Sequence, residues 1–105
     1  MKTKVVWTTS ARNELALIYQ YLLDNTSVSI ALNLIQDILD VSQLEQFPQS
    51  GAIESNLVKV IGEYRYLIRG RNNYKIIYRV EGDTVYIVDI FDCRKDPKQM
   101  KERIK

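Results

Sequence analysis

Basic side chains that could bind or act on an anion gather in the C-terminal half of this chain. The stretch NNYKIIYRVEGDTVYIVDIFDCRKDP, residues 72–97, carries Lys75, Arg79 and Arg94 between apolar and aromatic residues. Guanidinium and ammonium groups bind carboxylate and phosphate oxygens. In a site that excludes water they also stabilise the charge that develops during phosphoryl transfer. The residue types therefore point to anion recognition or to phosphoryl transfer.

The charges of the whole chain are segregated along the sequence. Residues 1–58 carry a net charge of −3, residues 59–79 carry +5, residues 80–93 carry −4, and residues 94–105 carry +4. Two basic blocks in the C-terminal half predict an anionic partner, either nucleic acid or an acidic protein surface. The alternative is that these side chains are the solvated outer face of an ordinary sheet.

Residue types that are missing from the sequence exclude several kinds of chemistry. The chain has no histidine, one cysteine (Cys93) and four scattered glycines. Nucleophilic triads that need histidine, most zinc sites and glycine-rich phosphate loops are therefore excluded. We expect no metal and no cofactor, and an enzyme would have to use Arg, Lys, Tyr or carboxylates. Cys93 is expected to be a small, half-buried filler at the end of a strand.

The same composition bounds the location of the protein. No apolar run approaches the ~20 residues of a membrane-spanning helix, and the first residues turn polar too early for a signal peptide. A lone cysteine favours a reducing compartment. We therefore expect a cytoplasmic protein without a membrane partner.

The first half of the chain has the periodicity of two helices. A short strand at residues 4–8 precedes Thr9 and Ser10, which offer N-cap oxygens. Apolar residues then recur at helical spacing until the polar residues 24–27, which end the first helix and cap the second. The second helix is predicted to run to about Phe47, followed by a polar loop at residues 48–57. So short a break between the helices predicts an antiparallel helix hairpin.

The second half changes to the two-residue period of strands. Residues 57–61 and 63–69 are predicted to form the first arm, and residues 74–81 and 84–92 the next two strands, with a short basic helix or tail at 98–104. Turns are expected at residues 70–73 and at Gly82-Asp83. The order is β-α-α-β-β-β in one domain, residues 1–105. This is an α+β fold with the helix hairpin packed on a small, mainly antiparallel sheet.

The two-residue loop at Gly82-Asp83 sets a register for the last two strands. It places Tyr78 opposite Ile87, Ile76 opposite Asp89 and, on the other face, Lys75 opposite Ile90. Continued outward, this register puts Lys75, Arg79 and Arg94 on the face away from the helices. An even connection before residue 74 would bury Arg65 and Arg69 unpaired under the helices, which would be costly. We therefore expect an odd connection, which places both arginines on the same outer face. The expected target-binding surface is Arg65, Arg69, Lys75, Arg79 and Arg94.

The ordered set of motifs resembles toxins of the RelE/ParE superfamily from type II toxin–antitoxin systems. The resemblance covers about residues 5–98 and rests on VVWTTSARNELALIYQYL, FPQSG, YRYLIRG, NYKIIYRVEGDTVYIVDIFD and the closing CRKDP. The family fold, a helix hairpin against an antiparallel sheet, agrees with the arrangement predicted from periodicity.

The resemblance implies one of two activities. RelE-like members are ribosome-dependent mRNA endoribonucleases that use basic residues on the sheet, and the matching positions here are Arg65, Lys75 and Arg94. Other positions depart from that pattern: Leu67 stands where a second basic residue is expected, and Met100 stands near the position of a C-terminal tyrosine. A general base is therefore missing, unless Tyr64 or Tyr66 points outward, and its loss is worth about 10²–10⁴ in rate.

ParE-like members use the same scaffold without that catalytic set, bind DNA gyrase and trap its cleaved complex with DNA. The long helices, the FPQSG loop and the closing Arg-Lys-Asp-Pro favour this branch, so we expect a protein that is not an enzyme. Either branch implies a cognate antitoxin and a hetero-oligomer with it. A third alternative is an inactive member that serves only as a co-repressor with its antitoxin. In either toxic branch, alanine at Arg65, Lys75 or Arg94 is expected to weaken toxicity and leave stability nearly unchanged.

Overall fold

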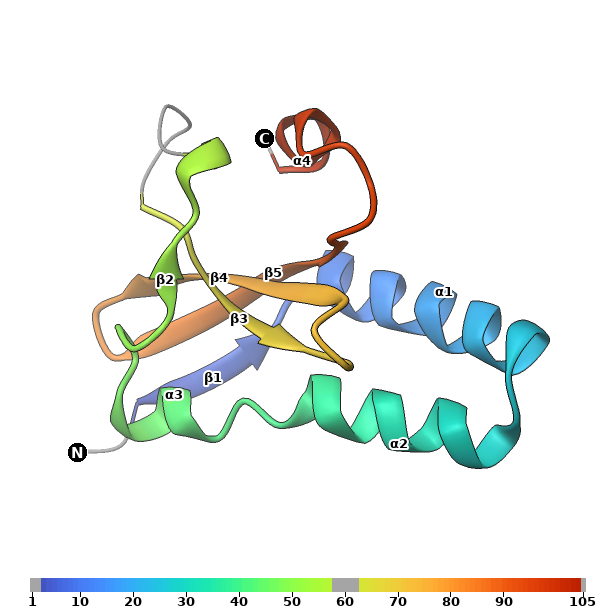
Figure 1. The fold of residues 1–105 in the computed structure, drawn as a ribbon. Helices are drawn as coiled ribbons and strands as arrows, with labels where there is room; N and C mark the ends of the chain where they lie inside the picture. Colours follow the sequence, from blue (N-terminus) through green and yellow to red (C-terminus); the bar gives the residue numbers. More distant parts are fainter. Residues whose placement is uncertain (1–2, 58–62, 105) are drawn as a thin grey trace.

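The computed structural model of the chain describes residues 3–57 and 63–104. A five-stranded sheet forms the middle layer, with a pair of long helices against one face and a short C-terminal helix over the other (Figure 1). The α+β class and the β-α-α-β-β-β order are therefore confirmed. Among the described residues, no helix is long and apolar enough to cross a lipid bilayer.

The helix pair consists of α1 (Thr9–Asn25) and α2 (Val28–Leu39). The Thr8 side chain accepts a hydrogen bond from the Ala11 backbone N–H and so caps α1, one residue before the predicted cap. Ser27 caps α2 by accepting from Ile30 N–H, as the polar break predicted. Only two residues separate the helices, which gives the expected hairpin.

The second helix ends earlier than its apolar pattern suggested. Instead of running to Phe47, α2 stops at Leu39, and a separate four-residue helix, α3 (Gln43–Gln46), follows. Arg69 donates from Nε to the Asp40 carbonyl at 3.0 Å. That contact satisfies a carbonyl at the end of the helix, so this arginine from the sheet helps to end α2 where it does.

The sheet has the order β1-β5-β4-β3-β2. Its strands are β1 (Lys4–Trp7), β2 (Ala52–Ile53), β3 (Arg65–Arg69), β4 (Tyr74–Glu81) and β5 (Thr84–Asp92). β1 is parallel to β5, and the other pairs are antiparallel. β5 lies between β1 and β4, which explains why both of its faces are apolar. β2 was predicted as loop, and the predicted strand at residues 57–61 falls mostly outside the described residues.

The β4–β5 hairpin follows the predicted register only up to Tyr78 and Ile87. A β-bulge then shifts the pairing, so that Ile77 lies opposite Asp89, Ile76 opposite Ile90 and Lys75 opposite Phe91. The extra residue in β5 is Val88. Beyond the bulge each β5 residue pairs with the β4 residue one position later in sequence than predicted, which reverses the face assigned to the end of β5.

The connection from β3 to β4 is even, and the predicted odd connection is wrong. Arg69 pairs with Tyr74 across the four-residue turn 70–73, and Arg65 pairs with Tyr78. Arg65, Leu67 and Arg69 therefore share the face of Tyr74, Ile76 and Tyr78, toward the helix hairpin.

Two apolar clusters lie on opposite faces of the sheet. The larger one, between the sheet and the helix hairpin, includes the fully buried Ile38, Ile76 and Ile87. The smaller one lies beneath α4 (Lys98–Arg103) and the 3₁₀ turn at Ser55–Leu57. Its members are Leu57, Tyr64, Ile77, Phe91, Met100 and Ile104. Both faces of the sheet are therefore covered in part, in agreement with the apolar residues on both faces of the last strand.

We predict that Gly70→Ala destabilises the fold more than Gly82→Ala. Both glycines have positive φ, +66° and +59°, where any L side chain is strained by about 1–2 kcal/mol. A Cβ at Gly70 would also lie 2.7 Å from Tyr74 Cδ2 and 3.3 Å from Ile38 Cγ1, whereas nothing lies within 4 Å at Gly82. Overpacking adds about 1–3 kcal/mol at Gly70. Urea unfolding followed by circular dichroism measures the difference, and equal losses would contradict the packing shown here.

Candidate functional site

The five predicted target-binding residues do not form one surface. Lys75 and Arg79 point to the face away from the helix hairpin, together with Ile77. Arg65 and Arg69 point to the hairpin face, and Arg94 lies against Tyr74 on that face as well. The predicted common face is therefore wrong, because of the bulge in β5 and the even turn before β4.

Arg65 and Arg69 are tolerated on the hairpin face because each finds acceptors at the edge of the sheet. Arg65 Nη1 donates to the carbonyls of Gln49 and Gly51 at 3.2 and 2.8 Å, and Nη2 lies 3.0 Å from Glu63 Oε1. Arg69 donates to three oxygens, including Gln43 Oε1 at 2.8 Å. The sequence analysis treated these arginines as unpaired, and they are not. Both tie the edge of the sheet to the loop segments beside it.

Lys75 is paired with a buried acid on the other face. Its Nζ lies 2.6 Å from Glu54 Oε1 and 4.3 Å from the centre of the Tyr66 ring. The Glu54 side chain is 1% exposed, and its Oε2 accepts from both the backbone and the side-chain nitrogen of Asn56. This lysine therefore neutralises an internal carboxylate, and only 21% of its side chain is exposed.

Arg79 stands over an aromatic ring on the same outer face. Its guanidinium carbon lies 4.5 Å from the centre of the Tyr86 ring, and it forms an ion pair with Glu81. About a third of the side chain is exposed. A partner that contacts Arg79 would therefore also lie beside the carboxylate of Glu81.

Arg94 follows the end of β5 and forms a two-point contact with Asp92. Its Nε and Nη2 each lie 2.9 Å from a different oxygen of that carboxylate, and Nη2 reaches the Tyr74 hydroxyl at 3.4 Å. The hydrogen bond from Arg94 lowers the pKa of Asp92, and Asp92 raises the pKa of Arg94 still further above its usual range. Burial raises the pKa of Tyr74. At neutral pH the site thus holds a fixed ion pair beside a neutral phenol.

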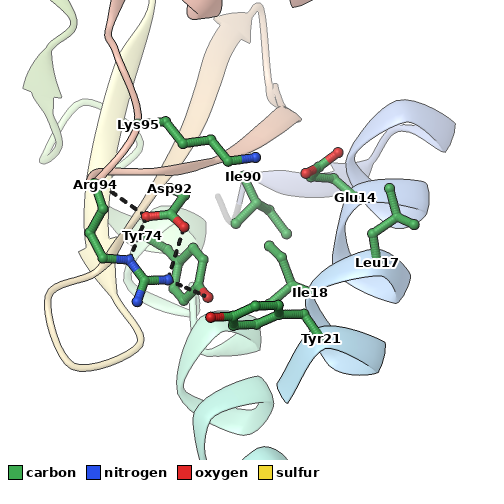
Figure 2. A pocket seen from close by; sticks show the side chains of 9 residues that line it. All are labelled: Glu14, Leu17, Ile18, Tyr21, Tyr74, Ile90, Asp92, Arg94 and Lys95. Carbon is green, nitrogen blue, oxygen red and sulfur yellow. Dashed lines mark hydrogen bonds and ion pairs between the residues drawn. The ribbon is translucent and has the colours of Figure 1, made fainter. Parts of the chain in front are cut away.

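A groove opens beside this pair, between α1 and the end of β5 (Figure 2). Its volume is about 590 Å³. Figure 2 shows Leu17 and Tyr21 of α1 on one side, with Arg94 and Tyr74 across from them and Lys95 over the opening. The complete lining is Glu14, Leu17, Ile18, Tyr21, Tyr74, Ile90, Asp92, Arg94 and Lys95.

A second hollow of about 270 Å³ continues the groove toward the end of the helix hairpin at which α1 and α2 are connected. The two share Tyr21, Tyr74 and Arg94, and the second also reaches Arg71 in the β3–β4 turn. Within the described residues, Lys95 and Arg71 make no ion pair. We call the two hollows together the α1 groove. Its combination of apolar floor, tyrosine walls and cationic rim suits a peptide that carries apolar and acidic side chains.

The sequence analysis missed the residues that make this groove. Leu17 and Tyr21 widen the apolar stripe of the first helix, yet they are 65% and 51% exposed. The available signal was the width of that stripe, which exceeds what one buried face of a helix needs. Cys93 was also misjudged, since it is exposed rather than half-buried.

The arrangement favours binding over catalysis. Arg65, Lys75 and Arg94, the residues that a ribonuclease would use, lie on different parts of the sheet, and each is engaged by a carboxylate. Stabilising an in-line phosphoryl transfer requires such charges to converge on one phosphate. They do not converge in this structure.

Comparison with known proteins identifies the family of the chain. Residues 5–97 match the family described as the ParE toxin of the type II toxin-antitoxin system parDE. The fold is similar to that of a solved chain of the chromosomal ParDE TA system from P. aeruginosa, with a TM-score of 0.72 and 28% sequence identity. The similarity covers 86% of this chain and 95% of that chain. No curated protein sequence matches the chain. With the family match spanning nearly the whole sequence and the fold in agreement, the chain belongs to the ParE toxin family of type II toxin–antitoxin systems.

Proposed function

We propose that this toxin stops bacterial growth in the cytoplasm by binding DNA gyrase and trapping the gyrase–DNA cleavage complex, and that a cognate antitoxin neutralises it. The observation that carries the choice of gyrase over mRNA is the separation of Arg65, Lys75 and Arg94. Gyrase poisoning requires binding energy rather than a cluster of charges around a scissile phosphate.

Two of the five predicted target contacts suit this role better than the others. Arg94 is about half exposed and Arg79 about a third exposed, whereas Arg65 and Lys75 are held by internal acceptors. We propose Arg79 and Arg94 as target contacts, and we assign Arg65, Arg69 and Lys75 mainly to the stability of the sheet.

One culture tests the function. The toxin is induced without its antitoxin, and growth, plasmid topology and mRNA 5′ ends are scored together. Gyrase poisoning predicts growth arrest with linearised plasmid and unchanged mRNA ends. New 5′ ends within translated mRNA would assign the ribonuclease activity instead, and normal growth would leave only a co-repressor role.

Purified components make the same distinction without the cell. Supercoiled plasmid, gyrase and the toxin are incubated with ATP and then treated with detergent and protease. We expect cleaved plasmid to accumulate with toxin concentration. A parallel incubation with translating ribosomes should leave the mRNA intact.

We further propose the α1 groove as the seat of the antitoxin. Type II antitoxins neutralise toxins by direct contact, and the exposed Leu17 and Tyr21 beside a cationic rim fit an acidic, amphipathic segment. Exposed apolar side chains beside a groove are typical of interaction sites. Covering them by the antitoxin should also raise the melting temperature of the toxin.

Tyr21→Ala is predicted to weaken antitoxin binding about 30-fold, the loss of one interface anchor of about 2 kcal/mol. Leu17→Ala should weaken it to a lesser extent. The matched control is Leu32→Ala, an equally conservative change at an exposed leucine of α2 outside the groove. Calorimetric titration with the antitoxin gives the three affinities. If Leu32→Ala costs as much as Tyr21→Ala, the antitoxin sits elsewhere on the hairpin.

A further inference from the structure

The turn between β3 and β4 contains three consecutive residues whose φ angles lie in the left-handed region. The φ angles of Gly70, Arg71 and Asn72 are +66°, +56° and +65°. Glycine adopts this conformation freely, and asparagine tolerates it because its short polar side chain can bond to the nearby backbone. For an arginine the same conformation is strained, since its Cβ approaches the following carbonyl oxygen. Arg71 is therefore the strained residue of the turn.

No ion pair within the described residues requires an arginine at this position. Arg71 is exposed, and it is absent from the ion pairs that the other arginines of the sheet make. An asparagine or a glycine would close the same turn with less strain. Strained backbone conformations of this kind persist mainly at functional sites. The side chain of Arg71 is therefore a candidate for a contact with another molecule.

Backbone hydrogen bonds fix this turn to α2 and to the end of β5. Asp37 of α2 accepts from the Gly70 N–H at 2.5 Å. The Asn73 N–H donates to the Gly70 carbonyl at 3.2 Å, and the Cys93 N–H donates to the Asn73 carbonyl at 2.8 Å. Arg71 thus projects from a fixed point, and a partner does not have to order the backbone that carries it.

Arg71 lines the second hollow of the α1 groove, and that hollow is cationic. Its lining contains the guanidinium groups of Arg71 and Arg94, and none of the described residues that line it is an acid. Arg94 already binds both carboxylate oxygens of Asp92. Arg71 therefore supplies the charge that is left to an anionic occupant of this hollow.

The apolar part of the lining decides which kind of anion fits. Leu22, Ile30 and Leu34 supply apolar side chains from the helix hairpin. A nucleic acid strand carries a phosphate at every nucleotide and gains little from such a surface. A peptide with a carboxylate next to an apolar side chain satisfies both parts of the hollow. The hollow also continues the groove proposed for the antitoxin, since Tyr21 and Tyr74 line both.

We propose that Arg71 is a selectivity contact of the toxin for its antitoxin, and that its guanidinium binds a carboxylate of the antitoxin segment where this segment passes the connection of α1 and α2. The inference rests on the α1 groove as the seat of the antitoxin and adds a residue that distinguishes the cognate antitoxin from others. A carboxylate at this point of the antitoxin forms a two-point contact with the guanidinium. A lysine or arginine there meets like charge from both Arg71 and Arg94, which rejects such an antitoxin.

The first test removes the charge and the strain together. Arg71→Asn should raise the melting temperature of the free toxin by about 3 °C, because asparagine tolerates the left-handed conformation. The same change should weaken antitoxin binding about tenfold in calorimetric titration at ~0.1 M salt, and the difference should shrink as salt is raised. Arg71→Lys keeps the charge and should lose less affinity than Arg71→Asn. Stability and affinity are thus expected to change in opposite directions.

Arg12→Asn is the matched control, because it removes an exposed arginine of α1 that lines neither hollow. Equal losses of affinity in Arg12→Asn and Arg71→Asn would reflect net charge alone and would overturn the proposal. Unchanged affinity of Arg71→Asn would also overturn it, but the α1 groove would remain the seat if Tyr21→Ala still weakens binding. A loss of gyrase-dependent plasmid cleavage with intact antitoxin affinity would assign Arg71 to the target instead.

The second test identifies the partner carboxylate by exchanging charges. Arg71→Glu reverses the charge in the hollow, and each Asp and Glu of the antitoxin is replaced by Lys in turn. One of these antitoxin variants should bind Arg71→Glu at least about tenfold more tightly than the unmodified antitoxin does, and should bind the wild-type toxin more weakly. Circular dichroism checks that free Arg71→Glu is folded. If no antitoxin variant prefers Arg71→Glu to the wild-type toxin, the proposed contact does not exist.

Discussion

Ile76→Ala is expected to lower the free energy of unfolding by about 2–5 kcal/mol, the range for truncating a large aliphatic side chain in a core. Ile76 is fully buried in β4, the central strand of the sheet, and faces the cluster beneath the helix hairpin. Removal of this side chain leaves a cavity between the sheet and the helix hairpin, because the backbones of the two layers keep them apart. Urea unfolding followed by circular dichroism at 222 nm measures the loss.

The size of this effect bears on the whole molecule, because a domain of this length is commonly stable by only 5–15 kcal/mol. Leu17→Ala is the matched control, since it removes a comparable amount of apolar surface from a side chain that is 65% exposed. We expect it to change stability by no more than about 0.5 kcal/mol. A loss below 1 kcal/mol for Ile76→Ala would mean that the helix hairpin packs loosely on the sheet.

The parts of the fold that depend on local signals could be predicted from the sequence. The Gly82-Asp83 loop permits only one close pairing of its flanking strands, and the four residues from Tyr78 to Glu81 pair as expected. Ser27 caps the second helix for the same reason: the hydrogen bond joins residues three apart in sequence. In each case the information lies within a few residues of the feature.

The bulge and the even turn could not be predicted because their causes are distant in sequence. β5 is otherwise apolar on both faces, so Asp89 was the single sign of the shift that the extra Val88 causes, because the predicted register placed this acid opposite Ile76 under the helices. Arg65 and Arg69 face the hairpin only because carbonyls of residues 40, 49 and 51 accept from them. Those carbonyls come near only after the chain has folded. The sequence analysis assumed that these arginines would be unpaired on the hairpin face, and it therefore assigned them to the wrong face.

The prediction of the candidate site failed for the same two reasons, the bulge in β5 and the even turn before β4. With β5 in the predicted register, Arg94 would have joined Lys75 on the outer face and would not have lined the α1 groove. The bulge moves Arg94 toward Tyr21 and Tyr74 and leaves Lys75 to a buried acid. One inserted residue therefore divides a supposed catalytic cluster into a groove on one face and a structural ion pair on the other.

Lys75→Ala is accordingly expected to destabilise the protein, in contrast to the small effect expected from the sequence. Glu54 is 1% exposed, and removal of Lys75 leaves its carboxylate with only the two nitrogens of Asn56. Breaking a buried ion pair at one partner costs about 3–5 kcal/mol. Because Lys75 itself is 21% exposed and water can screen it, we expect a smaller loss, about 1–3 kcal/mol.

A double-mutant cycle separates this structural role from any role in toxicity. Glu54→Gln removes the buried charge and keeps an oxygen that Asn56 can donate to, so Lys75→Ala should cost little in that background. The coupling energy from urea unfolding is expected to be at least about 0.5 kcal/mol, as for groups in direct contact. If the two losses simply add, Lys75 does not stabilise Glu54. If Lys75→Ala/Glu54→Gln is stable and still arrests growth, the ammonium group is dispensable for the target, as the separation of Lys75 from Arg94 implies.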